Sequence, residues 1–266
     1  MQYRNANWAA LLIAAMVIGF SGLVAAEEKG EPDGAPELPS VDEVNQHLDE
    51  LYRSTSSRAK MTMTIVTERR GTRELSMDAW TRGDNDALFV IRSPAREAGT
   101  ATLRTDEGLW NYAPRADRLV RVPTGMLSDS WMGSHLTNDD LVQETGYRED
   151  YDVTLEWGEA GGERVLKANM TPKRGAPVVY TRVVYTLDAE HWTPRGAEFF
   201  DGKSKIRTIE FSDVREVRGK RVPHQMVVRP QDKPRESTTL KYGELAFDVD
   251  IDEAIFTRRG LRRIAR

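Results

Sequence analysis

The chain has 266 residues, contains no cysteine, and carries 38 basic against 42 acidic residues for a net charge of −4. The absence of cysteine excludes disulfide bonds, thiolate metal ligands, a cysteine nucleophile and a lipid-modified N-terminal cysteine. The near balance of charge gives no general footprint for nucleic acid or for a membrane surface.

The N-terminus has the pattern of a cleavable signal peptide. Arg4 supplies a positive start, residues 9–18 are apolar, and the small residues 24–26 precede Glu27. The pattern predicts export to the periplasm with cleavage after Ala26. A membrane anchor over residues 8–26 is the alternative, which the cleavage site and the acidic stretch after it disfavour.

The boundaries of the folded part follow from composition. Residues 27–39 are acidic and rich in Pro and Gly, which is typical of a flexible linker. Residues 40–266 are enough for one large domain with its own core. Ser40 and Glu43 have the spacing of a capping box, and the apolar residues that follow predict an amphipathic helix over 41–53.

The remainder has the pattern of short strands. Apolar and polar residues alternate in short runs, separated by polar turns, over residues 60–122 and again over 152–246. No strand–helix–strand alternation indicates a doubly wound fold. We therefore expect an α+β protein with a large curved antiparallel sheet of about 11–12 strands, a half-open β-barrel whose concave side is closed by helices. The apolar residues among 255–264 are expected to dock against the core.

Residues 128–141 interrupt this meander with large apolar side chains. Trp131, Met132 and Leu136 stand among small residues, and residues 137–140 suit a helix start because their oxygens accept hydrogen bonds from free amides. A long interruption of this composition is typical of a functional loop and not of disorder. We expect it to form a lid over an apolar cavity. Asp139 and Asp140 are expected to cap a helix in preference to acting as an acid pair or a cation site.

The chain resembles a known family. The run Leu-Trp-Asn-Tyr-Ala-Pro-Arg (109–115), the run over 130–141, and Trp-Thr-Pro (192–194) look like those of outer-membrane lipoprotein-sorting proteins, relatives of the periplasmic lipoprotein carrier LolA. The resemblance covers roughly residues 45–260. It implies a LolA-like fold and a periplasmic carrier that moves lipid or acylated lipoprotein between the inner and outer membranes. It also implies an inner-membrane exporter of the RND/MMPL or ABC type as donor, and an outer-membrane acceptor. The alternative is a periplasmic sensor or adaptor that uses the same fold to bind a transporter or another protein.

A carrier needs apolar side chains around its cavity, and methionine adapts well to such a role. The residues expected at the cavity and lid are Met61, Met63, Ile65, Met77, Phe89, Ile91, Trp110, Tyr112, Met126, Trp131, Met132 and Leu136. Ordinary core packing is the alternative for the methionines, and a rim contact or packing for Trp110 and Tyr112. Arg92 is expected on the surface, or else holding a helix through its carbonyl groups.

Enzyme chemistry is not indicated by the sequence. The histidines at 47, 135, 191 and 224 are scattered, with no metal-binding HExxH pair. There is no Gly-x-Ser-x-Gly elbow and no phosphate loop, so we expect no catalytic residues, metal or cofactor. The arginine cluster over residues 258–266 is expected to be a solvated tail, with a docking role or a lipid-surface role as the alternative.

Overall fold

The computed structural model describes residues 37–52, 54–83, 85–142, 151–176 and 178–266. The predicted signal peptide and most of the predicted linker lie outside the described residues. The strands are β1 (Ser56–Thr67), β2 (Gly71–Arg82), β3 (Asp86–Ser93), β4 (Ala101–Thr105), β5 (Gly108–Ala113), β6 (Arg118–Arg121), β7 (Tyr151–Ala160), β8 (Glu163–Pro172), β9 (Arg182–Asp188), β10 (Pro194–Asp201), β11 (Ser204–Val217), β12 (Lys220–Pro230) and β13 (Ser237–Phe247). Within these residues, no helix is both long and apolar enough to cross a membrane.

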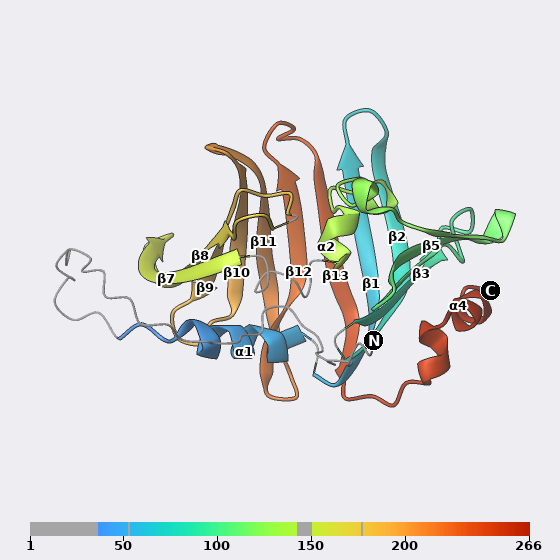
Figure 1. Ribbon diagram of the computed structural model, residues 1–266, viewed down its shortest axis with the longest axis horizontal. Coiled ribbons are helices and arrows are strands. Elements are labelled where there is room, and N and C mark those ends of the chain that lie inside the picture. Colours follow the sequence, from blue (N-terminus) through green and yellow to red (C-terminus); the bar gives the residue numbers. More distant parts are fainter. Residues whose placement is uncertain (1–36, 53, 84, 143–150, 177) are drawn as a thin grey trace, which may run out of the picture.

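All thirteen strands belong to one sheet, which is curved and does not close (Figure 1). Its order is β6-β5-β4-β3-β2-β1-β13-β12-β11-β10-β9-β8-β7, and every pairing is antiparallel. Two meanders therefore meet at a seam between β1 and β13, and the edge strands β6 and β7 are consecutive in the sequence. The α+β class and the curved, half-open antiparallel sheet predicted from the sequence are confirmed, with slightly more strands than expected.

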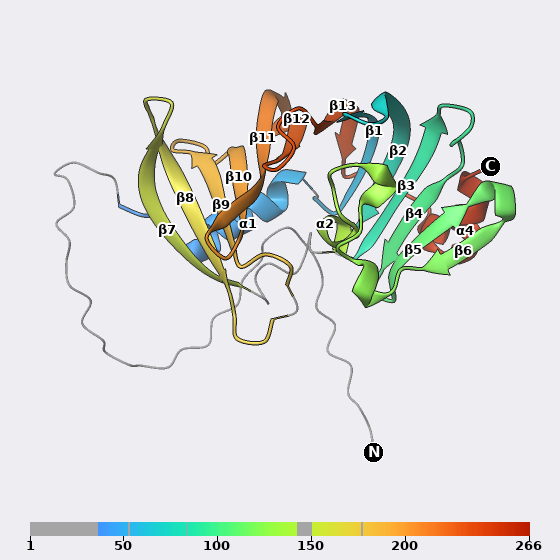
Figure 2. The same ribbon diagram turned by 90° about the horizontal axis from the view of Figure 1, so that it is seen from above.

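The helix α1 (Val41–Tyr52) covers part of the concave side (Figure 2). Its capping box is present: the Glu43 carboxylate accepts hydrogen bonds from the Ser40 hydroxyl and backbone N–H at 2.7 and 2.8 Å, and these lower the pKa of Glu43. Val44, Leu48 and Leu51 are buried against residues of the β7–β13 half of the sheet. The apolar stripe thus lies on the sheet, as its spacing predicts.

The C-terminal residues pack on the opposite face of the sheet. The 3₁₀ turn η5 (Glu253–Phe256) and the helix α4 (Arg258–Ile264) bury Phe256 and Leu261 against the outward side chains of β3, β4 and β5 (Figure 2). Arg92 donates a hydrogen bond to the Ile264 carbonyl at 2.9 Å and another to Asp78 at 2.8 Å. The docking of this segment is confirmed, and Arg92 does hold a helix through a carbonyl group, although that helix lies outside the concave side.

Candidate functional site

An apolar cavity of about 200 Å³ lies on the concave side of the sheet. Its floor comes from both meanders, and its cover comes from Leu48 of α1 and from the 128–141 segment. Two polar residues of the floor satisfy each other, since the hydroxyls of Ser57 and Thr81 lie 2.6 Å apart. The lining residues are Leu48, Ser57, Ala59, Met61, Ala79, Thr81, Phe89, Trp131, Leu136, Asp140, Leu141, Tyr185, Pro194, Phe199, Ile209, Phe211, Pro223, Met226, Leu240, Tyr242 and Leu245.

Trp131 fixes the 128–141 segment over the β3–β5 part of the sheet. Its side chain is 2 % exposed, and its ring meets that of Phe89 edge to face, with 5.4 Å between centroids. Its indole N–H donates to the Thr102 hydroxyl at 3.0 Å, and that hydroxyl donates to the Asn111 side-chain oxygen at 2.8 Å. A buried indole N–H needs such a partner. Trp131 therefore faces the cavity and not the solvent.

The turn after Trp131 is held from β2. The 3₁₀ turn η3 (Trp131–Gly133) has Met132 at φ 51°, a conformation that is uncommon for a residue with a side chain. Arg73 donates from Nη1 to the Met132 carbonyl at 2.9 Å and also pairs with Glu97. This contact fixes the direction of the Met132 carbonyl in the left-handed turn.

His135 attaches the segment to the other meander. Its backbone N–H donates to the Thr238 hydroxyl at 2.9 Å, and its ring nitrogens lie 2.9 Å from that hydroxyl and 3.0 Å from Glu236. The hydrogen bond with His135, followed by one from the backbone N–H of Glu68, holds the pKa of the Glu236 carboxyl below its ordinary value. Thr238 and Glu236 belong to β13 and the turn before it, so the segment crosses the seam of the sheet.

Asp140 combines a capping role with a buried ion pair. Its backbone N–H donates to the Thr137 hydroxyl at 3.1 Å, and its carboxylate accepts from the Thr137 backbone N–H at 2.7 Å, which caps the short helix α2 (Asn138–Val142). The same carboxylate accepts two hydrogen bonds from Arg207 of β11, at 2.5 and 2.8 Å. The guanidinium carbon of Arg207 lies 4.2 Å from the ring centre of Phe199 and 4.8 Å from that of Tyr180. The predicted cap at Asp140 is confirmed, while the side chain of Asp139 lies outside the described residues.

The structure brings four of the predicted cavity residues together in the lining: Met61, Phe89, Trp131 and Leu136. Four others share the same core cluster but lie below the cavity surface, each no more than 2 % exposed: Met63, Ile65, Met77 and Ile91. Met132 packs against that cluster without lining the cavity.

Three predicted residues lie away from the cavity. Tyr112 and Trp110 pack with the outer cluster around α4, where the Tyr112 hydroxyl donates to Asp117 at 2.9 Å and burial, followed by that hydrogen bond, raises the pKa of Tyr112. The ring of Trp110 lies 4.1 Å from the guanidinium carbon of Arg258. Met126 is 49 % exposed in a surface turn. Trp110 and Tyr112 lie away from the cavity because α4 also buries the outer face of β4 and β5. Alternation of apolar and polar residues therefore does not identify the inner face of these strands.

Sequence reasoning missed the polar residues that hold the 128–141 segment. Thr102 and Arg104 of β4 are 0 % and 4 % exposed, and Arg104 donates to the Leu141 carbonyl at 3.2 Å. Arg207 is equally buried, at 6 % exposed. In an alternating strand such residues are expected on the solvent side. The one available signal was the cluster of hydrogen-bonding groups at 134–140, which requires partners on the sheet.

Solved structures with the same fold place the chain in a class. An outer membrane lipoprotein-sorting protein domain from Vibrio parahaemolyticus matches at 24 % identity and a TM-score of 0.73, over 83 % of this chain and 97 % of that one. A DUF1329 family protein from Desulfovibrio piger matches at 21 % identity and a TM-score of 0.72, over 82 % of this chain and 95 % of that one. A LolA superfamily protein from Nitrosomonas europaea matches at 19 % identity and a TM-score of 0.68, over 82 % of this chain and 97 % of that one. The protein therefore has a LolA-like fold, as the resemblance of its sequence implies.

The family follows from a match to a family model. The sequence model of a family of uncharacterized proteins matches residues 83–263, which is more than half of the chain. The chain belongs to this family. No curated protein matches it.

Proposed function

We propose that the protein is a periplasmic carrier that binds the acyl chains of a lipid or lipoprotein in its apolar cavity. The observation that carries the proposal is the lining itself, in which apolar side chains from both meanders, α1 and the 128–141 segment face one space. Burial of acyl chains there would gain about 0.8 kcal/mol per CH2 group. The similar domain from Vibrio parahaemolyticus is named as a lipoprotein-sorting domain, which agrees with such a cargo.

Loading requires the cavity to widen. Its volume of about 200 Å³ is below the roughly 300–1,000 Å³ of pockets that enclose small ligands. The 128–141 segment and α1 form its cover, and the segment is attached through hydrogen bonds and one ion pair instead of a strand pairing along its length. We propose that this cover moves outward when cargo enters, and that its return on an empty cavity assists release.

A carrier of this kind would work in the periplasm, between the inner and outer membranes. Export through the signal peptide, receipt of cargo from an inner-membrane exporter of the RND/MMPL or ABC type, and delivery to an outer-membrane acceptor complete the proposal. We assign no catalytic residue, metal or cofactor to the cavity.

Ala79 offers a direct test, because it lines the cavity opposite Ala59 of β1. Delipidated protein is incubated with dioctanoylglycerol, an uncharged lipid, and bound lipid is counted by native mass spectrometry. We expect Ala79→Phe to fill the cavity and reduce binding at least tenfold, while Ala160→Phe, at an exposed end of β7, binds as the unmodified protein does. Equal binding by both variants would refute the cavity as the binding site, provided that both retain the thermal unfolding of the parent.

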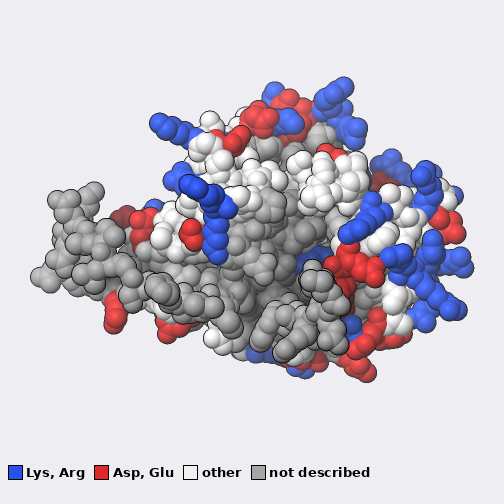
Figure 3. All heavy atoms as spheres, viewed as in Figure 1, with Lys and Arg blue, Asp and Glu red and all other residues white. Residues whose placement is uncertain are grey.

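The adaptor function is a second candidate, supported by a basic surface. Lys and Arg side chains gather at the edge of the molecule formed by α4 and β5–β6 (Figure 3). Its exposed arginines are Arg115, Arg118, Arg121, Arg258, Arg259, Arg263 and Arg266. Failure of the unmodified protein to bind any lipid in the same experiment would favour this second function.

A further inference from the structure

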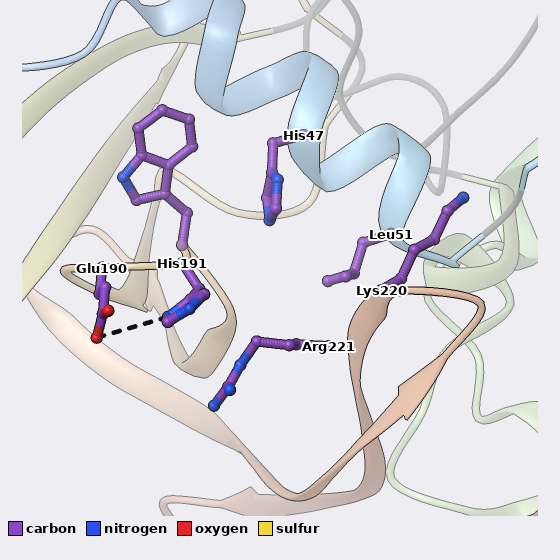
Figure 4. A pocket seen from close by; sticks show the side chains of 8 residues that line it. His47, Leu51, Glu190, His191, Lys220 and Arg221 are labelled. Atoms are coloured by element: carbon purple, nitrogen blue, oxygen red, sulfur yellow. Dashed lines mark ion pairs between the residues drawn. The ribbon is translucent and has the colours of Figure 1, made fainter.

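A second pocket, of about 410 Å³, lies between α1 and the turns that lead into β10 and β12. In Figure 4, His47 extends from α1 into it, with His191 and Arg221 across from it on the sheet side. The lining residues are His47, Leu51, Glu190, His191, Trp192, Gly219, Lys220 and Arg221.

The lining of this pocket is cationic. Lys220 and Arg221 carry positive charge, and the imidazoles of His47 and His191 line the same space. Arg221 is exposed at the pocket, and the amine of Lys220 lies 5.1 Å from the centre of the Phe247 ring. The single acid of the lining, Glu190, has a side chain that is 85 % exposed and lies 3.7 Å from Nδ1 of His191.

A second acid close to His191 forms hydrogen bonds with the backbone. Asp188 lies 3.8 Å from Nδ1 of His191, and its carboxylate accepts hydrogen bonds from the backbone N–H groups of Glu190, His191 and Thr193 at 3.1, 2.8 and 2.8 Å. Burial acts to raise the pKa of Asp188, but these hydrogen bonds outweigh it and the pKa is lowered. Asp188 thus holds the turn that carries His191 through backbone hydrogen bonds, and the cationic groups of the lining are Lys220 and Arg221.

The cationic pocket and the apolar cavity are lined by neighbouring residues of the same elements. On α1, His47 lines the pocket and its neighbour Leu48 lines the cavity. On β12, Arg221 lines the pocket and Pro223 lines the cavity, two residues further along the strand, or about 7 Å away. At the start of β10, Trp192 lines the pocket and Pro194 lines the cavity. On each of these three elements the two spaces are therefore only one or two residues apart.

We propose that this pocket binds a phosphate group, and that in a loaded carrier this is the phosphate of a lipid headgroup whose acyl chains occupy the cavity. Arginine and lysine bind phosphate oxygens through charge-assisted hydrogen bonds, which are stronger than neutral ones. This inference rests on the proposed function for the headgroup, but the phosphate site itself does not depend on acyl binding. Lys220 and Arg221 would then select an anionic lipid over an uncharged one with the same chains.

The test compares two lipids that differ only in phosphate. Dioctanoyl phosphatidic acid and dioctanoylglycerol are titrated into the delipidated, intact protein, into Lys220→Gln/Arg221→Gln, and into the control Lys203→Gln/Lys233→Gln. The control removes the same charge from two exposed turns outside the pocket. Inorganic phosphate is titrated into all three by calorimetry.

We expect the parent and the control to bind phosphatidic acid about tenfold more tightly than dioctanoylglycerol, and the pocket variant to lose this preference while it keeps its affinity for dioctanoylglycerol. A preference for phosphatidic acid that the pocket variant retains would overturn the proposal. So would a parent that neither prefers phosphatidic acid nor binds inorganic phosphate. Inorganic phosphate bound by the parent and not by the pocket variant, without a lipid preference, supports a pocket for free phosphate and rejects the headgroup. If neither lipid binds the parent, the proposed carrier function fails, and the phosphate titration alone decides the pocket.

Discussion

Asp140 shows how a single residue connects the cover of the cavity to the sheet. It caps α2 and pairs with Arg207, and the two side chains are 13 % and 7 % exposed. A buried charge that loses its partner costs far more than an exposed one, because the interior cannot solvate it. The rings of Tyr180 and Phe199 lie against the Arg207 guanidinium, so aromatic groups and not solvent surround it there.

We therefore expect Asp140→Asn to lower the free energy of unfolding by about 3 kcal/mol. Urea unfolding followed by tryptophan fluorescence measures this change, since Trp131 lies in the same segment. The control is Asp213→Asn, which removes an exposed carboxylate paired with Arg215 and should leave stability nearly unchanged. A loss in Asp140→Asn as small as that in the control would contradict this expectation and show that the ion pair contributes little to stability.

Glu236 gives the stability of the protein a dependence on pH. Its folded-state pKa is below the ordinary value, chiefly because His135 hydrogen bonds to its carboxylate. A carboxyl group with a lowered folded pKa contributes stability above its unfolded pKa, and this contribution is lost as the pH falls through the folded pKa. We expect Glu236→Gln to shift the urea midpoint downward at pH 7, and the difference from the parent to shrink as the pH falls below about 4.3, the ordinary pKa of a glutamate. A difference that stays constant down to pH 3 would contradict this assignment.

The matching control for that experiment is Glu244→Gln. Glu244 pairs with Lys60 on the surface, with side chains that are 69 % and 52 % exposed. Such pairs contribute little to stability. We expect its urea midpoint to follow that of the parent at neutral pH.

At the scale of the element, the strand β4 explains what sequence reasoning could and could not find. Four of its five residues are buried, with Ala101 and Leu103 under α4 and with Thr102 and Arg104 under the 128–141 segment. Alternation identifies a buried face only when the other face meets solvent. The strand itself was therefore predictable from its sequence, but its orientation was not, and Trp110 and Tyr112 on the neighbouring strand were misplaced for the same reason.

The methionines show a second limit on what alternation along a strand can predict. Period-two alternation places Met61, Met63 and Met77 on one face of the sheet, and the structure confirms that shared face. Only Met61 reaches the cavity. Position along the strand depends on where α1 and the 128–141 segment cross the sheet, which a local pattern does not encode. Trp131 and Leu136 were predictable as cavity residues because the interrupting segment supplies large apolar groups with no other place to bury them.

Gly260 allows α4 to approach η5 closely. A Cβ atom at this position would lie 1.7 Å from the carbonyl oxygen of Ala254, which is part of the backbone and cannot turn aside. We expect Gly260→Ala to displace α4 and lower the free energy of unfolding by about 2 kcal/mol or more. Gly125→Ala is the control, since nothing lies within 4 Å of its added Cβ and its stability should change by less than about 0.5 kcal/mol. Thermal unfolding of the two variants side by side is sufficient to distinguish them.

At the scale of the whole molecule, the strand order dictates where the cover of the cavity lies. The edge strands β6 and β7 are consecutive in sequence yet lie at opposite ends of the sheet. The connection between them must therefore run from one edge to the other, and its described part, which includes residues 128–141, lies across the concave side. The helix α1 precedes β1, the seam strand of the first meander, and covers the other half. One part of the cover is thus a connection between strands and the other is the helix before β1, so both can move without breaking a strand pairing of the sheet.

This arrangement predicts which segments respond to cargo. We expect binding of dioctanoylglycerol to change amide hydrogen exchange in residues 41–52 and 128–141, because these form the cover of the cavity. The helix α4 packs on the opposite face of the sheet, so exchange over residues 258–264 should be unchanged and serves as an internal control. Mass spectrometry of peptides from the free and loaded protein measures both regions in one sample. A response that is equal in α4 and the 128–141 segment would mean that the lipid loosens or stabilises the sheet as a whole, and the cover would then have no separate motion.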